Sequence, residues 1–509
     1  KKFAGKHDIN LMAGYENYYE YIEELGADRD GYVLTNFPYL NNGPKDLIGN
    51  SGKGKEYAYR SYFGRVMYSY ADRYLFQANI RHDGSSRFAK KHRWGTFPSF
   101  SAGWVLSEEN FMKNLNWEWL SFLKIRATWG ALGNERIGDF PYMSTIAFGN
   151  TIFYQNNGIY FDQTASQQKY AIENVTWEKT ESTDIGLDIS FLNNRLRVNG
   201  DYYWKNTKDM LLAMAIPDFL GFSDPDVNAG KMSTKGYELN VSWNDHIGDF
   251  SYGIAINFSD FTSKMGDLQG TQFLGDKVKM EGSEFNEWYG YVSDGLFLTE
   301  EDLKNSPKIN DKNTQLGDIK YKDISGPDGV PDGKISPEYD RVLLGSSLPH
   351  FLYGGNINLG YKNFDLSLAF QGVGKQNARL AREMVEPFRN NYGNFPAIID
   401  GNYWSPYNTD EQNAVAKYPR LTHVNKSSNY AMSDYWLFNG GYFRLKNITL
   451  GYTFPKEWMN AIGIKGARIY ASASDLFCLS KYPKGWDPEM GVSEYPITTS
   501  ILLGVSVNF

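Results

Sequence analysis

The sequence predicts an all-β protein, a transmembrane antiparallel β-barrel with about 14 strands and long extracellular loops. Three observations carry this prediction. Apolar and polar residues alternate along many segments, the connections between these segments alternate between long and short, and aromatic residues lie at the ends of the apolar stripes. A period of two residues is typical of a β-strand with one apolar face. In a membrane barrel that face contacts lipid, and the polar face lines the lumen.

The strands are expected wherever every second residue is apolar. Clear examples of such stripes begin at Leu123, Ile185, Tyr237, Tyr252 and Phe364. The expected strands, in order, span residues 7–22, 60–70, 74–83, 96–107, 120–132, 177–192, 195–206, 232–244, 250–261, 351–361, 364–373, 442–454, 466–477 and 498–509.

The last strand shows the pattern most clearly. In the closing segment ILLGVSVNF, the odd-numbered residues from Ile501 to Phe509 are all apolar and share one face. The closing strand of an outer-membrane barrel has this form. The last strand of a soluble sandwich has it too, so this segment alone leaves both architectures open.

The connections favour the membrane barrel over the sandwich. The longest connections follow odd-numbered strands and the shortest follow even-numbered ones, as at 71–73, 193–194 and 362–363. Outer-membrane barrels have short periplasmic turns and long outer loops, whereas a sandwich has no reason to sort its loops. The same count places Phe509 on the periplasmic side. Loops at about 262–350 and 374–441 contain Trp and Tyr, so we expect them to be ordered over the mouth of the barrel.

The ends of the apolar stripes carry aromatic residues, which is where the interfacial girdles of a membrane barrel belong. These residues are Trp129, Trp243, Tyr252, Phe258, Tyr361 and Tyr452.

Composition and charge narrow the function classes. The chain has 509 residues, of which 16% are aromatic, and its net charge of −7 argues against nucleic acid as the main partner. Mean hydropathy is −0.51, and no apolar run is long enough for a membrane helix, but a barrel needs none because only alternate residues face lipid. Cys478 is the only cysteine and the six histidines lack metal-ligand spacing, so we expect neither an internal disulfide nor an enzyme.

Longer stretches of sequence carry a family signal. They are RYLFQANIRHDGSSRF from Arg73, GTFPSFSAGWVLSEENFM from Gly95, LSFLKIRATWGALGNERIGDFPY from Leu120, TWEKTESTDIGLDISFLNNRLRVNGDYYWKNTKDMLL from Thr176, NAGKMSTKGYELNVSWN from Asn228, WYGYVSDGLF from Trp288, GDIKYKDISGPDGVPDGKISPEYDRVLLGSSLPHFLYGGNINLGYKNFDLSLAFQG from Gly317 and YFRLKNITLGYTFP from Tyr442. In this order, and over nearly the whole chain, they resemble the SusC/RagA family of TonB-dependent outer-membrane transporters. The specificity lies in their number and order, since none is a catalytic motif.

The resemblance implies a 22-strand barrel with an N-terminal plug. It also implies a TonB box, a carboxypeptidase-like N-terminal extension and a SusD-like lipoprotein lid. The chain departs from this pattern because it begins at Lys1 with strand-like sequence and shows no plug. We therefore expect residues 1–509 to be the C-terminal part of the barrel, with the plug domain and the first strands on a longer precursor or another chain.

The function implied by the resemblance is TonB-dependent import of oligosaccharides or peptides across the outer membrane. Two alternatives stay open: a TonB-dependent receptor for a metal chelate or cobalamin without a lipoprotein lid, and a surface scaffold or adhesin. The expected partners are a SusD-like surface lipoprotein, TonB through the missing N-terminal part, the glycan or peptide substrate, and outer-membrane lipid. The sequence does not name the substrate.

The acidic segment 323–340 is the candidate metal site. Asp328, Asp332 and Asp340 resemble the D-x-[DN]-x-[DN]-G loop, in which oxygen ligands from a tight turn hold Ca²⁺. Val330 stands where a third-position ligand belongs, and Asp340 falls late in the pattern. The side chains that could substitute are Asp323 and Ser325. The alternative is an acidic Gly/Pro turn that binds no metal.

Aromatic residues in the long loops are the candidate ligand contacts. One tract contains Tyr403, Trp404, Tyr407, Tyr418, Pro419 and Arg420, and another contains Trp288, Tyr289 and Tyr291. Aromatic faces suit stacking on sugar rings or on the surface of a partner. Packing within the loop itself is the alternative, and the sequence favours it.

Overall fold

The computed structural model describes residues 2–509 except 156–157, 168, 215, 271, 273, 390–393 and 491–493. Its main sheet contains all fourteen predicted strands and the two-residue strand β1 (Lys2–Phe3), in the order β1-β2-β3-β4-β5-β6-β9-β10-β13-β14-β20-β21-β24-β25-β26. Neighbours in the sheet are thus successive strands of the predicted set, as in an up-and-down barrel wall.

The fourteen strands have the following bounds: β2 (His7–Arg29), β3 (Ile48–Tyr70), β4 (Tyr74–Ser85), β5 (Trp94–Val105), β6 (Leu120–Asn134), β9 (Glu178–Phe191), β10 (Leu196–Lys208), β13 (Met232–Ile247), β14 (Phe250–Met265), β20 (His350–Tyr361), β21 (Phe364–Lys375), β24 (Tyr442–Thr453), β25 (Gly466–Ser480) and β26 (Ser500–Asn508).

Two of these strands, β2 and β3, extend furthest beyond their predicted bounds. β2 and β3 pair over their full lengths, from His7 opposite Tyr70 to Arg29 opposite Ile48. The outer part of this two-stranded ribbon is exposed on both faces, with Lys53 and Glu24 forming an ion pair at 2.9 Å. A ribbon with two exposed faces needs no alternation of apolar and polar residues, which is why periodicity missed it.

The chain forms two compact units, residues 1–104, 126–183 and 205–231 in the first and 105–125, 184–204 and 232–509 in the second. The first unit has a small apolar core formed by Phe88, Phe97, Ile137, Val175 and Trp177. It also carries two separate strand pairs that periodicity did not predict, β7 (Ile146–Gln155) with β8 (Gly158–Gln167) and β11 (Leu211–Ala213) with β12 (Asp226–Asn228).

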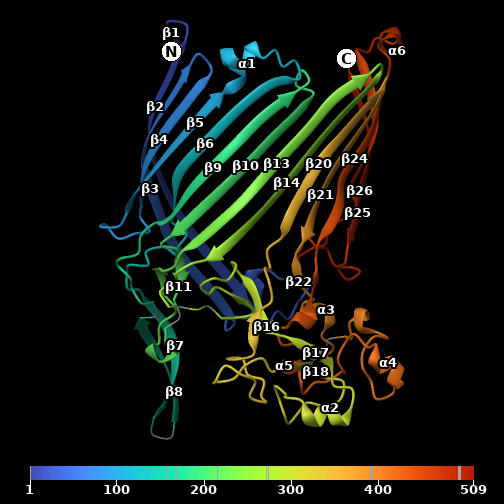
Figure 1. The fold of residues 1–509 in the computed structure, drawn as a ribbon. Helices are drawn as coiled ribbons and strands as arrows, with labels where there is room; N and C mark the ends of the chain where they lie inside the picture. The colour runs from blue at the N-terminus through green and yellow to red at the C-terminus, as the bar shows by residue number, and fades with distance from the viewer. Residues whose placement is uncertain are drawn as a thin grey trace. The chain divides into compact units, whose positions relative to one another are not determined.

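In the second unit, β13, β14, β20, β21 and β24–β26 run side by side, and the shorter elements gather beyond one end of them (Figure 1). These shorter strands are β15 (Lys277–Val278), β16 (Glu287–Tyr291), β17 (Ser293–Leu296), β18 (Ile319–Tyr321), β19 (Arg341–Leu343), β22 (Asn377–Arg379) and β23 (Leu437–Asn439). The helices beside them are α2 (Glu300–Asn305), α3 (Arg382–Val385), α4 (Asp410–Ala414) and α5 (Lys426–Asn429).

The remaining helices are α1 (Asn110–Asn114) and α6 (Lys456–Ala461), together with short 3-10 turns. No helix among the described residues has the length and apolarity needed to cross a membrane.

The predicted alternation of long and short connections is confirmed for most of the strands, but the connections on either side of β5, 86–93 and 106–119, do not follow it. Short turns join β9 to β10, β13 to β14 and β20 to β21. Several turn residues have positive φ, including Asn193 at 58°, Asn194 at 65° and Lys362 at 51°. Such backbone conformations match the twist of two-residue hairpin turns. The longest connections in the second unit are 266–349 and 376–441.

The apolar stripes of the second unit stay exposed. Leu450 on β24 is 51% exposed and Leu503 on β26 is 80% exposed, and Ile256 on β14 also belongs to this exposed set. In a sandwich these side chains would be buried against a second sheet. Their exposure, combined with polar residues on the opposite face, is typical of a wall that meets lipid.

Candidate functional site

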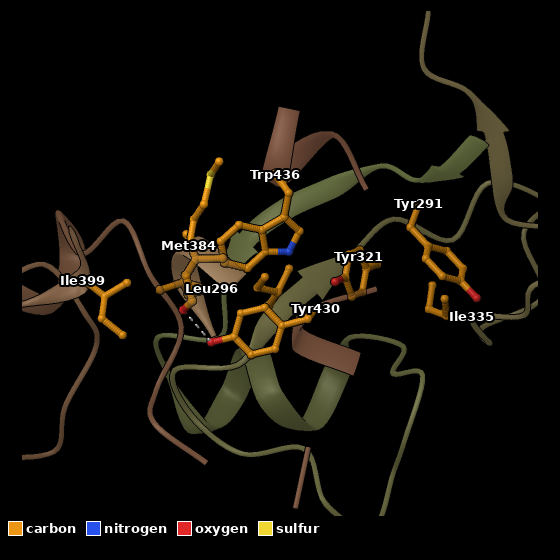
Figure 2. Close-up of a cluster of buried hydrophobic side chains, with 10 residues drawn as sticks. Tyr291, Leu296, Tyr321, Ile335, Met384, Ile399, Tyr430 and Trp436 are labelled. Carbon is orange, nitrogen blue, oxygen red and sulfur yellow. Dashed lines mark hydrogen bonds between the residues drawn. The ribbon is translucent and has the colours of Figure 1, made fainter. Parts of the chain in front are cut away.

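The connections 266–349 and 376–441 fold together into a structure that we call the loop module. Over their described residues both connections are ordered, as predicted. The buried core of the module is drawn in Figure 2 and consists of Tyr291, Leu296, Ile319, Tyr321, Ile335, Met384, Val385, Ile399, Tyr430 and Trp436. Residues from both connections contribute, so the core holds them to one another.

Trp436 lies at the centre of this core and is 2% exposed. Its ring stacks on Tyr430, with ring centroids 5.2 Å apart (Figure 2). Its indole Nε1 donates to the backbone carbonyl of Asn429 at 2.9 Å, which satisfies the one polar atom of the side chain. Tyr321 likewise donates its hydroxyl to the carbonyl of Ser428 at 2.7 Å, and burial raises the pKa of Tyr321.

A buried carboxylate, Asp318, joins the two connections. Its side chain is fully buried and forms an ion pair with Arg420, whose Nε lies 2.7 Å from Asp318 Oδ1. The Nδ2 atoms of Asn425 and Asn429 donate to Asp318 at 2.8 and 2.9 Å, and the backbone amide of Gln315 donates at 2.9 Å. A buried charge is tolerated only when it is paired and hydrogen-bonded, and here both conditions are met.

A second buried carboxylate, Glu386, follows α3. Its side chain pairs with Arg382 at 2.5 Å and with Lys426 at 3.3 Å. Burial by itself would raise the pKa of Glu386, but these two cations outweigh burial and hold the pKa below its ordinary value. Glu386 therefore links α3 to α5 as a carboxylate at neutral pH.

A cleft of about 590 Å³ opens on the loop module. The residues that line it are Glu300, Leu303, Gln315, Leu316, Tyr403, Trp404, Ser405, Pro406, Tyr407, Arg420 and Leu421. Its size lies in the range of small-molecule sites, and it combines aromatic rings with a few polar groups, as such sites do.

The predicted aromatic residues divide between packing and the cleft. Trp404 packs directly over Gly317, where an added Cβ would lie 2.3 Å from the indole ring. Tyr418 stacks on the buried Trp436, with centroids 6.3 Å apart, so its role is internal packing. Tyr407 is different: its side chain lines the cleft and is 96% exposed.

The second predicted aromatic tract is engaged within the module. Trp288 donates its Nε1 to the carbonyl of Asn377 at 2.6 Å. The guanidinium carbon Cζ of Arg341 lies 4.4 Å from the ring centroid of Tyr289. Tyr291 is part of the buried core. The packing alternative holds for these residues.

The candidate metal segment is a turn held by its own hydrogen bonds. Asp340 is fully buried, and its carboxylate accepts from the backbone amides of Ile324 and Ser336 at 2.8 and 2.7 Å. Asp332 accepts from the amide of Lys334 at 3.0 Å. The carboxylates of Asp340 and Asp332 are thus used by the turn itself.

Asp328 is exposed in the same turn. In the part of the chain that the structure describes, no three His, Cys, Asp or Glu side chains come together in a group that could hold a metal ion. Calcium binding by Asp328, Asp332 and Asp340 remains a prediction that no observation here tests.

A charged cluster lies on the polar face of the strands in the second unit. Arg444, which is 2% exposed, pairs with Asp487 at 2.6 Å and with Glu489 at 2.5 Å. Gln371 on β21 donates to the same Glu489 at 2.7 Å. Lys446, on a bulge of β24, pairs with Asp475 at 2.7 Å. The cluster ties the connection after β25 to the strand wall.

Sequence reasoning missed Asp318, Glu386 and Arg444. Each is a buried charged residue with at least one partner distant in the sequence, as with Asp318 and Arg420, which are 102 residues apart. Periodicity carries no signal for such pairs. Arg420 was singled out for its aromatic neighbours, and its ion pair with Asp318 was not anticipated.

Comparisons with known proteins agree with this architecture. Residues 2–476 match the family described as TonB dependent receptor-like, beta-barrel. TonB-dependent receptor P3 of Formosa agariphila is 30% identical over 96% of this chain and 48% of its own length. TonB-dependent receptor SusC of Bacteroides thetaiotaomicron is 31% identical over 100% of this chain and 49% of its own length. The chain thus spans about half the length of these curated relatives.

Among solved structures, the RagAB peptide transporter aligns over 99% of this chain and 53% of the matched chain, with a TM-score of 0.81 and 23% sequence identity. A likeness at this identity shows a shared fold.

Proposed function

This chain belongs to the TonB-dependent receptor β-barrel family, and we propose that the receptor containing it imports oligosaccharides or peptides across the outer membrane. The resemblance to SusC and RagA, the membrane β-barrel fold and the outer-membrane location are all confirmed. The proposal concerns the whole receptor, because the chain spans only about half of its curated relatives.

The observation that carries the proposal is a strand wall with an exposed apolar face that ends in a folded loop module. The wall suits a lipid environment, and the module presents a cleft of small-ligand size beyond the long-loop end of the strands. Import also requires the parts implied by the family resemblance: a plug, a TonB box and a SusD-like surface lipoprotein that closes over the substrate.

Growth on defined nutrients tests the proposal. The gene is deleted in the organism that encodes it, and growth is measured on single purified glycans and on peptide mixtures, with a tonB deletion strain and a complemented strain as controls. Loss of growth on one polymer class, shared with the tonB strain and restored by complementation, is the expected result. Unchanged growth on every glycan and peptide would refute import.

Purification of the tagged receptor separates the proposal from its alternatives. A lidded importer is expected to bring down a surface lipoprotein in a fixed ratio. A receptor for a metal chelate or cobalamin would purify without a lipoprotein lid. Deleting its gene would then prevent growth that depends on that chelate or on cobalamin. An adhesin would leave uptake normal and reduce attachment.

A further inference from the structure

The segment 403–413 forms a tightly hydrogen-bonded turn. Asn413 donates to the carbonyl of Ser405 at 2.9 Å, and its Oδ1 accepts from the Ser405 amide at 3.0 Å. Asn408 donates to the carbonyl of Tyr403 at 3.0 Å. The turn then enters α4 through a capping box between Thr409 and Gln412. These bonds fix the backbone on both sides of Tyr407.

Tyr407 extends from this fixed turn and is almost fully exposed. The chain has many exposed apolar residues, and single ones are ordinary on any surface. Tyr407 differs because its backbone is held on both sides, because it is 96% exposed, and because its side chain lines a cleft. A rigid aromatic side chain loses little conformational entropy on binding, which suits it for contact with a ligand.

The rest of the cleft complements an aromatic contact with polar groups. Trp404 lines the cleft and is held over Gly317. Gln315 and Glu300 line the cleft with exposed polar side chains. An apolar ring face bordered by hydrogen-bonding groups matches a pyranose, which has apolar C–H faces and hydroxyls around its rim.

The charges of the cleft select against an acidic ligand. Arg420 lines the cleft, but its charge is neutralised by the buried carboxylate of Asp318, with contacts at 2.7 and 3.1 Å. Glu300 is the other charged lining residue, and it is negative. An anionic saccharide or an acidic peptide would meet Glu300 without an uncompensated cation to balance it.

We propose that the cleft between Trp404 and Tyr407 binds a neutral oligosaccharide, with a sugar ring stacked on Tyr407. This inference rests on the proposed import function and narrows its substrate class from oligosaccharides or peptides to neutral glycans. The site lies on the loop module and is formed by its own residues.

Calorimetry on the detergent-solubilised full receptor tests the site. The probes are maltohexaose, laminarihexaose, cellohexaose, mannohexaose and xylohexaose, with hexagalacturonate as the acidic comparison and hexa-alanine as the peptide comparison. The test variant is Tyr407→Ala, which removes an exposed side chain and so leaves the fold intact. The matched control is Tyr495→Ala, which removes a tyrosine that is 80% exposed and lies outside the cleft.

We expect one neutral probe to bind. Tyr407→Ala should raise the Kd for that probe about tenfold, and Tyr495→Ala should leave the Kd unchanged. The inference is overturned if no neutral probe binds, if Tyr407→Ala leaves the Kd unchanged, or if only hexagalacturonate or hexa-alanine shows the dependence on Tyr407.

The two proposals fail in different ways. If the receptor is needed for growth on peptides alone and no saccharide binds, the import function stands and the saccharide site is rejected. Saccharide binding that depends on Tyr407, together with normal growth after gene deletion, would keep the site and reject import.

Discussion

Replacing Asp318 by asparagine tests whether the buried ion pair holds the loop module together. Asp318 Oδ1 accepts from Asn429, and Oδ2 accepts from Asn425, from the Gln315 amide and from Arg420 at 3.1 Å. Whichever oxygen becomes an amide nitrogen then faces at least one donor, and the guanidinium loses its counter-charge in a buried site.

The cost follows from that geometry. Breaking a buried ion pair by removing one partner costs about 3–5 kcal/mol, because a charge remains buried without compensation. If the loop module opens as a unit, this corresponds to roughly 100-fold to 4,000-fold faster amide exchange within it. The fourteen strands of the main sheet are expected to keep their protection from exchange, because the described hydrogen bonds of the Asp318 side chain reach none of them.

Hydrogen–deuterium exchange read by mass spectrometry measures this effect peptide by peptide. The matched control is Asp276→Asn, which breaks an exposed pair with Arg379 at 2.5 Å and should cost about 0–1 kcal/mol. Unchanged exchange around Ile319 and Trp436 in the Asp318→Asn variant would refute the reasoning. A loss of protection across the strands of the main sheet would also refute it, since that result would mean that Asp318 stabilises the whole chain and not the loop module alone.

Three further predictions follow from the structure. The pKa of Glu386 lies below its ordinary value of 4.5, so the stability that its ion pairs supply is present at neutral pH and is lost as the pH falls below about 4.5. Amide exchange in α3, corrected for intrinsic rate, should therefore be faster in Glu386→Gln than in wild type at pH 7. The two exchange rates should converge in acid. Leu450→Arg on the exposed apolar face should cost about 2–4 kcal/mol and reduce the amount of folded receptor in the outer membrane, whereas Thr449→Arg on the opposite face should not; equal loss in both variants would contradict the assignment of the faces. Calcium titration by calorimetry should give heat with wild type and none with Asp332→Ala if the acidic turn binds the metal, and no heat in either would exclude calcium there.

The strand wall could be predicted because its signal is local. Each strand needs only that every second residue be apolar, and the pattern is visible in any ten-residue window, as in the stretches that begin at Ile185 and Phe364. The turns between them are equally local, since positive-φ positions such as Asn193 and Asn194 follow directly from a short polar connection.

The loop module could be predicted to be ordered, but its internal contacts could not. Its aromatic content indicated a core, yet which rings are buried depends on pairings across about a hundred residues. Trp436 and Tyr407 are both aromatic loop residues, and nothing near either in the sequence shows that one is buried and the other exposed. The same holds for Asp318 and Arg420, whose pairing is set by the folded module and not by any local pattern.

The tight turns at one end of the strands also constrain how this molecule can diversify. The link between β20 and β21 consists of Lys362 and Asn363 alone, so one inserted residue would slip the register and exchange the faces of the following strand. The connection 266–349 has no such limit, because its length is not tied to strand register. The whole loop module can therefore be replaced without changing the strand wall, and a chimaera made by swapping 266–349 and 376–441 together should insert into the membrane as the parent does.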